Sequence, residues 1–160
     1  MLASFGRLAE APEARRRSDP PENPVTVPGF HIRHEALDVI VDHARAAAPA
    51  ECCGMLVGRD ASIDEAVRAP NIAASPTRFL VDPKDHIDAM RAARRRGLEV
   101  LGFYHSHPHS PAWPSPTDVA EAAYPDSVYL IVSLKGAAED TRLFRIERGG
   151  ASELPLITVP

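Results

Sequence analysis

The chain has 160 residues, a formal net charge of -4, 44% hydrophobic residues and 25% charged residues. These values fit a globular domain with one core, and they exclude a general electrostatic attraction to nucleic acid. No stretch approaches the roughly 20 consecutive apolar residues that cross a bilayer, so we expect no contact with a membrane.

The first 28 residues have the composition of a tail. They are rich in proline, and their arginine triplet is balanced by nearby acidic residues. Because they lack a periodic apolar pattern, we predict that residues 1–28 are disordered and that residues 29–160 form one domain.

The order of apolar and polar residues predicts strands and a helix in the next part of the chain. A short strand is expected near Phe30 and Ile32, followed by a helix over residues 34–48 that carries one apolar stripe. Two strands follow at residues 52–59 and 63–67, separated by a polar turn. They predict a hairpin.

The middle of the chain predicts a strand, a helix and a second strand. Residues 78–81 have strand character, and Asp82 with Pro83 then opens a helix that Gly97 stops. Acidic residues come early in this helix and arginines late, which complements the helix dipole. Residues 98–104 follow as a buried strand.

The last part predicts a short helix over residues 116–123 and an apolar strand over residues 127–134. Two alternating segments complete the chain at residues 142–146 and 153–159. Strands therefore outnumber helices and interleave with them, which indicates the α/β class.

The two cysteines, Cys52 and Cys53, are adjacent. Neighbouring residues rarely reach the torsion of a relaxed disulfide, so both are expected to be thiols. With no apolar run of the secretory type near the start, a reducing cytoplasm is the expected compartment.

A candidate metal site follows the strand at residues 98–104. Side chains at i and i+2 of a strand project from the same face about 7 Å apart, so His105 and His107 can reach one ion. Asp118 becomes a third ligand if the proline-rich loop before it turns back. Three protein ligands leave one tetrahedral position open for water, which is typical of catalytic zinc.

Simpler explanations exist for each of these residues. A His-x-His pair often occurs by chance, and Ser115, Pro116 and Asp118 have the pattern of a helix N-terminus. The capping interpretation is compatible with a ligand role, because a cap fixes the backbone from which Asp118 extends. His109 has no partner at a suitable spacing and is expected to be solvated.

The pattern resembles the JAMM motif of the MPN-plus metalloprotease family, which is His-x-His, seven residues, Ser, two residues, Asp. His105, His107, Ser115 and Asp118 fill this motif without a gap. The segment PAECCGMLVG is similar to the upstream segment of bacterial members, and Glu51 matches their glutamate. The resemblance covers roughly residues 30–158.

The resemblance implies an MPN (cytidine-deaminase-like) fold, with a mixed, curved β-sheet flanked by helices in a single domain. It implies one Zn²⁺ per chain, held by His105, His107 and Asp118. Glu51 would accept a proton from the attacking water and return it to the departing amine. Ser115 would hydrogen-bond the developing oxyanion. From the sequence alone, Glu51 would be interpreted as a surface carboxylate.

The resemblance also implies a substrate class, because the family cleaves amide bonds after the C-terminal glycine of ubiquitin-like or sulfur-carrier proteins. The short connections favour a small bacterial-type enzyme. Two alternatives are a non-catalytic MPN scaffold and a cysteine hydrolase that uses Cys52 or Cys53. The carrier, the leaving amine, a homodimer and a substrate contact of Trp113 or Cys53 are left open.

Overall fold

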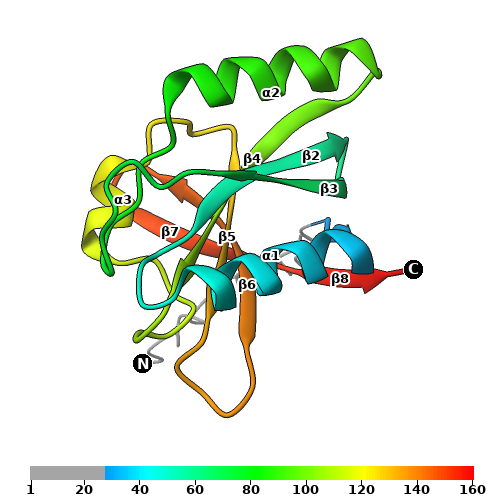
Figure 1. Ribbon diagram of the computed structural model, residues 1–160. Coiled ribbons are helices and arrows are strands. Elements are labelled where there is room, and N and C mark those ends of the chain that lie inside the picture. The colour runs from blue at the N-terminus through cyan, green and yellow to red at the C-terminus, as the bar shows by residue number, and fades with distance from the viewer. Residues whose placement is uncertain (1–27) are drawn as a thin grey trace, which may run out of the picture.

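The computed structural model describes residues 28–160, in which strands and helices alternate along the chain (Figure 1). Almost all of the predicted tail lies outside the described residues. The elements are β1 (Phe30–Arg33), α1 (His34–Ala47), β2 (Cys53–Arg59), β3 (Ser62–Ala69), α2 (Pro83–Arg95), β4 (Glu99–His107), α3 (Pro116–Glu121), β5 (Val128–Ser133), β6 (Asp140–Glu147), β7 (Gly150–Leu154) and β8 (Leu156–Val159).

These strands form one mixed sheet in the order β7-β6-β5-β4-β2-β3-β1-β8. The central strand β2 is antiparallel to β3 and β4, and β4 is parallel to β5. Parallel neighbours need a long crossover, and here the crossover contains the proline-rich loop and α3. The C-terminal end of β4 therefore leads into the segment that carries the remaining residues of the motif.

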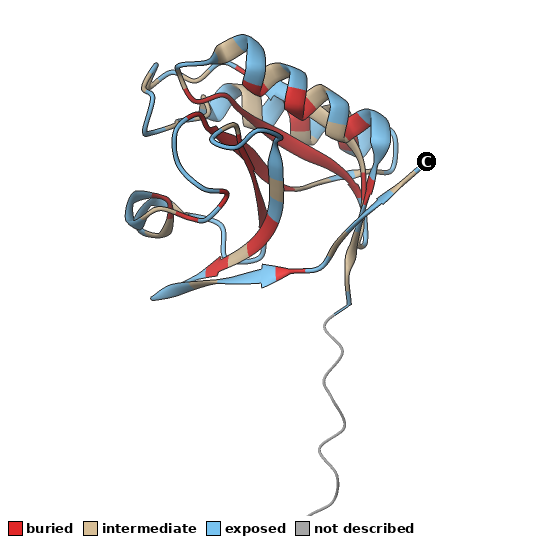
Figure 2. Cartoon of the chain, turned by 90° about the horizontal axis from the view of Figure 1, so that it is seen from below, coloured by how far each residue is buried: buried red, intermediate tan, exposed pale blue. Residues whose placement is uncertain are grey.

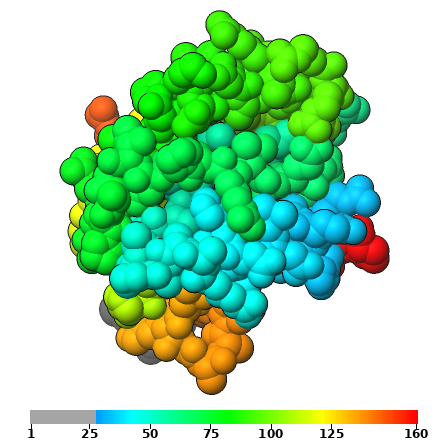
Figure 3. All heavy atoms as spheres, viewed as in Figure 1, coloured from blue at the N-terminus to red at the C-terminus, as the bar shows by residue number. Residues whose placement is uncertain are grey.

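Helices cover both faces of the sheet, and in Figure 1 β2 and β3 run between α2 above and α1 below. The alternation along β4 separates two cores: Tyr104 packs with residues of α1, whereas Phe103 packs with residues of α2 and of the crossover. Figure 2 shows the buried residues in the central strands and along the inner sides of the helices. In Figure 3 the side chains of α1 and α2 spread over the outer surface.

The helix boundaries follow from local signals that the sequence carries. Asp82 caps α2 by accepting a hydrogen bond from the Lys84 backbone N–H at 2.8 Å, and Pro83 occupies the first turn. Gly97 adopts a positive φ of 70° just after the helix, a conformation that glycine reaches without steric cost. The predicted start and stop of this helix are confirmed.

The predicted strand at residues 78–81 is wrong. In the structure this segment makes only one isolated bridge, between Asn71 and Val81. The Leu80 backbone N–H instead donates to the side-chain carbonyl of Asn71 at 3.0 Å. A side chain has therefore taken the place of a neighbouring strand, which the local apolar pattern does not reveal.

The predicted single segment at residues 153–159 is two strands on opposite edges of the sheet. β7 pairs with β6, whereas β8 pairs with β1 in the parallel direction. Pro155 lies between them and has no backbone N–H for a ladder bond, so it favours the break. β8 therefore forms one edge of the sheet, and β7 of the β6–β7 hairpin forms the other.

A methyl group at Gly54 in the middle of β2 should destabilise the fold. The added Cβ would overlap the Val67 carbonyl oxygen and the ring of Tyr104, both of which are fixed by the sheet. We expect Gly54→Ala to lower the free energy of unfolding by about 1–3 kcal/mol, measured by urea denaturation. Gly150→Ala is the matched control, since its Cβ meets nothing within 4 Å; equal losses in both variants would refute the packing argument.

Candidate metal centre and groove

The two histidines of the motif belong to β4 itself, which runs on to His107. They are buried, and alternation places both on the face that carries Phe103, the α2 side of the sheet. Ser106 points to the opposite face, where its hydroxyl accepts a hydrogen bond from the Cys52 backbone N–H at 2.8 Å. The strand thus fixes both imidazoles while Ser106 ties β4 to the start of β2.

Asp118 reaches the histidines from the first turn of α3. Ser115 caps this helix by accepting from the Asp118 backbone N–H at 3.1 Å, and the Asp118 carboxylate accepts from the Ser115 backbone N–H at 2.7 Å. Pro116 occupies the first turn. The predicted N-terminus is confirmed, and the capping box holds the Asp118 carboxylate in place.

The structure brings His105, His107 and Asp118 together as one buried group. These three residues form a triangle: the two histidine Nε2 atoms are 3.1 Å apart, His105 Nε2 lies 3.3 Å from one Asp118 carboxylate oxygen, and His107 Nε2 lies 3.3 Å from the other. Ligand atoms at tetrahedral positions about 2.0–2.1 Å from zinc are separated by about 3.3 Å. The measured spacings are therefore close to those between the ligand atoms of a tetrahedral metal ion.

The ionised Asp118 and the neutral His105 of this group suit a cation. Burial lowers the pKa of His105, so this imidazole is neutral near pH 7. Burial acts to lower the pKa of His107, but the hydrogen bond and charge of Asp118 outweigh it and raise this pKa. Burial acts to raise the pKa of Asp118, but the two histidines hold it well below its usual value. A carboxylate is thus maintained between two imidazoles.

The tautomer of His107 is fixed by a backbone contact outside the triangle. Its Nδ1 lies 2.7 Å from the Pro111 carbonyl oxygen, so Nδ1–H donates there and Nε2 is the nitrogen that faces the other ligands. His105 has no such contact, because its buried Nδ1 lacks a hydrogen-bond partner among residues 28–160. Its ring is held instead by Phe79, which stacks on it at 4.3 Å between ring centroids.

Glu51 precedes β2 and is 4% exposed. Its Oε2 has no hydrogen-bond partner among the described residues. Burial raises the pKa of Glu51 to about 7, with a smaller opposing effect of His107 and a further raising effect of Asp118. A buried carboxyl group that exchanges its proton near neutral pH is suited to acid–base chemistry.

The two cysteines are free thiols, as predicted, and both are buried. Burial raises the pKa of Cys53 to about 12 and also raises that of Cys52. The thiolate is the reactive form of cysteine, so a thiol held protonated in a buried strand is a poor nucleophile. The chemistry of this region therefore favours the metal site over a cysteine hydrolase.

Two other residues of the loop before α3 behave differently. His109 is exposed, in agreement with the prediction that it is solvated. Trp113 is half exposed and packs edge to face on Phe144 of β6, with ring centroids 5.1 Å apart. Trp113 thus packs against a residue of the sheet, and the composition of the loop did not indicate this contact.

A narrow groove of about 240 Å³ lies against the histidine and aspartate triangle, with His105 and Asp118 in its lining. Residues 79–81 and residues 121–124 both contribute to this lining. An ion pair of 2.7 Å joins Arg78, next to the first of these segments, to Glu121 of the second. The groove is lined mainly by apolar and aromatic side chains, so it suits an extended chain with small side groups.

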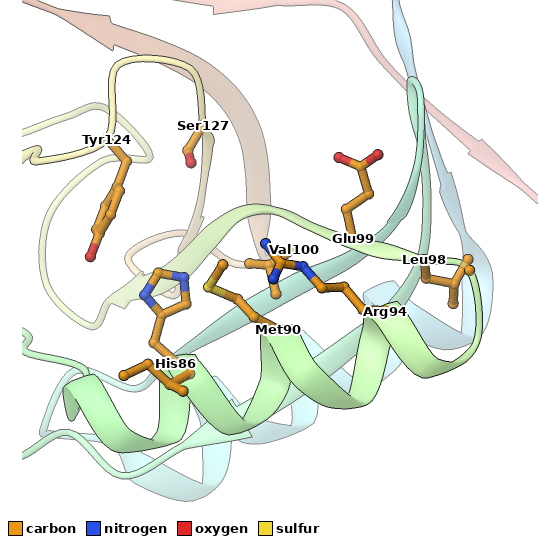
Figure 4. A pocket seen from close by; sticks show the side chains of 10 residues that line it. His86, Met90, Arg94, Leu98, Glu99, Val100, Tyr124 and Ser127 are labelled. Atoms are coloured by element: carbon orange, nitrogen blue, oxygen red, sulfur yellow. The ribbon is translucent and has the colours of Figure 1, made fainter.

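A wider hollow of about 780 Å³ lies between α2 and the start of β4. Figure 4 shows His86, Met90 and Arg94 extending from α2 toward this strand. None of the predicted site residues lines this hollow. The candidate chemistry therefore belongs to the smaller groove.

A family model described as prokaryotic homologs of the JAB domain, Prok-JAB, matches residues 33–147. The chain belongs to the Prok-JAB family. The matched range contains Glu51, Ser115 and the three residues of the triangle. The family resemblance predicted from the motif is thereby confirmed for most of the described chain.

Relatives of this Prok-JAB protein include peptidases. A desampylase of Haloferax volcanii is 41% identical over 109 residues, which cover 64% of this chain and 78% of the relative. A CysO-cysteine peptidase of Mycobacterium tuberculosis is 34% identical over 131 residues, which cover 80% of this chain and 90% of the relative.

Solved structures share the fold of this Prok-JAB protein. A protein of Desulfitobacterium hafniense matches with a TM-score of 0.76 and 32% identity, covering 81% of this chain and 92% of that one. A JAB1/MPN domain protein of Archaeoglobus fulgidus matches with a TM-score of 0.56 and 22% identity, covering 82% and 98%. The predicted MPN fold, a mixed sheet flanked by helices in a single domain, is confirmed.

Proposed function

We propose that this chain is a zinc-dependent hydrolase that cleaves peptide or isopeptide bonds after the C-terminal glycine of a ubiquitin-like or sulfur-carrier protein. The proposal rests on the triangle of His105, His107 and Asp118 and on the buried carboxyl group of Glu51, whose pKa responds to the charges of His107 and Asp118. Relatives that are a desampylase and a CysO-cysteine peptidase support the metallopeptidase activity and the substrate class.

We propose one Zn²⁺ per chain at His105, His107 and Asp118. Two imidazoles and one carboxylate suit zinc better than magnesium or calcium, which prefer oxygen ligands alone. Zinc bound there would polarise the scissile carbonyl and lower the pKa of water toward 7. The 3.1–3.3 Å spacings between the two Nε2 atoms and the Asp118 carboxylate oxygens, together with the neutral His105, support this assignment.

Glu51 and Ser115 would carry out the remaining steps of amide hydrolysis. The Glu51 carboxylate takes a proton from the attacking water and donates it to the departing amine, so the products are a carboxylate and a free amine. The Ser115 hydroxyl oxygen accepts a bond from the Asp118 N–H, which leaves its own hydrogen free to donate to the oxyanion. Residues 29–160 would thus constitute the catalytic domain.

The narrow groove is the proposed binding site for the carrier tail. Two glycines have no side chains, so an extended tail that ends in Gly-Gly suits a groove of this small volume, which His105 and Asp118 line. An extended segment can also pair with exposed backbone groups beside the groove. The rest of the carrier would then lie outside the groove.

Two further expectations concern the surroundings of the protein. None of the helices in residues 28–160 is long and apolar enough to cross a membrane. The free, buried thiols of Cys52 and Cys53 support the proposal that the protein works in a reducing cytoplasm.

The proposal is tested by incubating the full chain with ubiquitin-like and sulfur-carrier proteins from its own source, each with a C-terminal extension. We expect the mass of at least one carrier to fall to that of the form ending in Gly-Gly. Wild-type protein that binds zinc yet leaves every carrier intact would favour the non-catalytic scaffold instead.

Chelation and alkylation should separate the metal from the thiols in this assay. A strong zinc chelator should abolish cleavage, and added zinc should restore it, because the proposed reaction depends on the metal. Alkylation with iodoacetamide should leave the rate unchanged, since both cysteines are buried and their pKa values are raised. The reverse pattern would support a cysteine hydrolase.

A further inference from the structure

A loop of residues 71–81 connects β3 to α2 and contacts the candidate centre at two points. It begins with Asn71, whose side-chain amide uses all of its hydrogen-bonding capacity. Its Nδ2 donates to the carbonyl oxygens of Glu51 and Arg78, each at 3.0 Å. Its Oδ1 accepts from the backbone N–H groups of Ala73 and Leu80, each at 3.0 Å.

The first contact point is the backbone of Glu51. Its carbonyl oxygen accepts from Asn71, and its N–H donates to the Ser75 carbonyl oxygen at 2.9 Å. Glu51 itself lies just before β2, so no strand ladder holds it. The same loop therefore secures the peptide groups on both sides of the Glu51 side chain.

The second contact point is His105, through Phe79. Asn71 bonds the residues on either side of Phe79, because it donates to the Arg78 carbonyl oxygen and accepts from the Leu80 N–H. The Phe79 ring stacks on the His105 imidazole at 4.3 Å with an angle of 17° between the planes. One amide group thus connects the backbone of Glu51 to the ring that supports His105.

We propose that Asn71 is a positioning residue that sets the Glu51 carboxylate and the His105 imidazole relative to each other. This inference rests on the proposed function, in which both groups must address the same water and carbonyl. Residues that orient catalytic groups or metal ligands through hydrogen bonds typically contribute about 10- to 100-fold to activity. Substitution of such a residue should change kcat more than KM, because the residue orients catalytic groups and does not contact the substrate.

The test compares Asn71→Ala and Asn71→Asp with wild-type protein. Alanine removes all four hydrogen bonds, whereas aspartate keeps the two acceptor bonds and loses the two donor bonds, including the one to Glu51. Arg59→Ala is the matched control. Arg59 lies at the opposite end of β2, and its Nε donates a hydrogen bond of 3.1 Å to the Gly97 carbonyl oxygen in another turn.

We expect both Asn71 variants to bind one zinc per chain and to show kcat lowered by about 10- to 100-fold with KM within about threefold of wild type. Hydrogen exchange of the Glu51 amide, followed by NMR, should accelerate in both variants and stay unchanged in Arg59→Ala. The control should retain full kcat.

Wild-type kcat in Asn71→Asp, or a loss explained entirely by missing zinc or unfolded protein, would overturn the positioning role. A rise in KM at constant kcat would overturn it too, because Asn71 would then act on substrate binding. If wild-type protein cleaves no carrier, the proposed function fails, while unchanged exchange of the Glu51 amide would still refute the connection through Asn71.

Discussion

Glu51→Gln should retain one zinc per chain and lose at least about a hundred-fold in kcat on a carrier with a C-terminal extension. The amide keeps the shape of the side chain but neither accepts nor returns a proton, and general acid–base catalysis is worth about 10²- to 10⁴-fold. Steady-state kinetics by mass spectrometry, together with metal analysis of the same preparation, checks this result. Undiminished turnover would remove Glu51 from the mechanism.

The same substitution should stabilise the metal-free protein in alkaline solution. Burial raises the pKa of Glu51 to about 7 from an ordinary value near 4.5, so the folded chain holds this proton more tightly than the unfolded chain. The ionised carboxylate therefore reduces stability increasingly as the pH rises from about 4.5 to 7, and the reduction is complete above that. We expect Glu51→Gln to melt above wild type at pH 8, with a difference that vanishes near pH 4.

His107→Ala should abolish both zinc binding and cleavage. Mutation of a residue that hydrogen-bonds to a metal ligand typically lowers activity by about 10- to 100-fold. Loss of the ligand itself should have a larger effect, so we expect activity to fall by more than about a hundred-fold. His109→Ala is the matched control, because this histidine is exposed and lies only two residues away. Competition against a chromogenic chelator measures the affinity of both variants for zinc.

Thermal melts give a second readout of the same substitution. A ligand that binds only the folded state at a hundred times its Kd stabilises it by about 2.7 kcal/mol, which should raise the Tm by several degrees. Zinc should thus raise the Tm of wild type and His109→Ala but not that of His107→Ala. A full zinc-dependent shift in His107→Ala would place the ion elsewhere.

The residues of the triangle were predictable because their signals are local. His105 and His107 follow the two-residue period of a strand, and Ser115 with Asp118 follows the pattern of a helix N-terminus. Glu51 differs, since it lies 54 residues before His105 and, without the family resemblance, its own segment does not indicate a catalytic role. The family resemblance indicated its role, and the structure adds its burial and raised pKa.

The parts that escaped prediction depend on partners far along the chain. Phe79 contributes to an apolar pattern that suggests a strand, yet its function in the structure is to stack on His105. The segment around Pro155 alternates like one strand, but its two halves pair with β6 and β1 on opposite edges of the sheet. Pairing partners are chosen by tertiary packing, which a local pattern does not contain.

A zinc-edge anomalous diffraction map of the zinc-loaded protein would show whether the triangle holds zinc. We expect one peak per chain, bonded to Nε2 of His105, Nε2 of His107 and a carboxylate oxygen of Asp118 at about 2.0–2.2 Å, with an open position toward Glu51. A peak bound by other residues, or a triangle without zinc in protein that cleaves carriers, would contradict it.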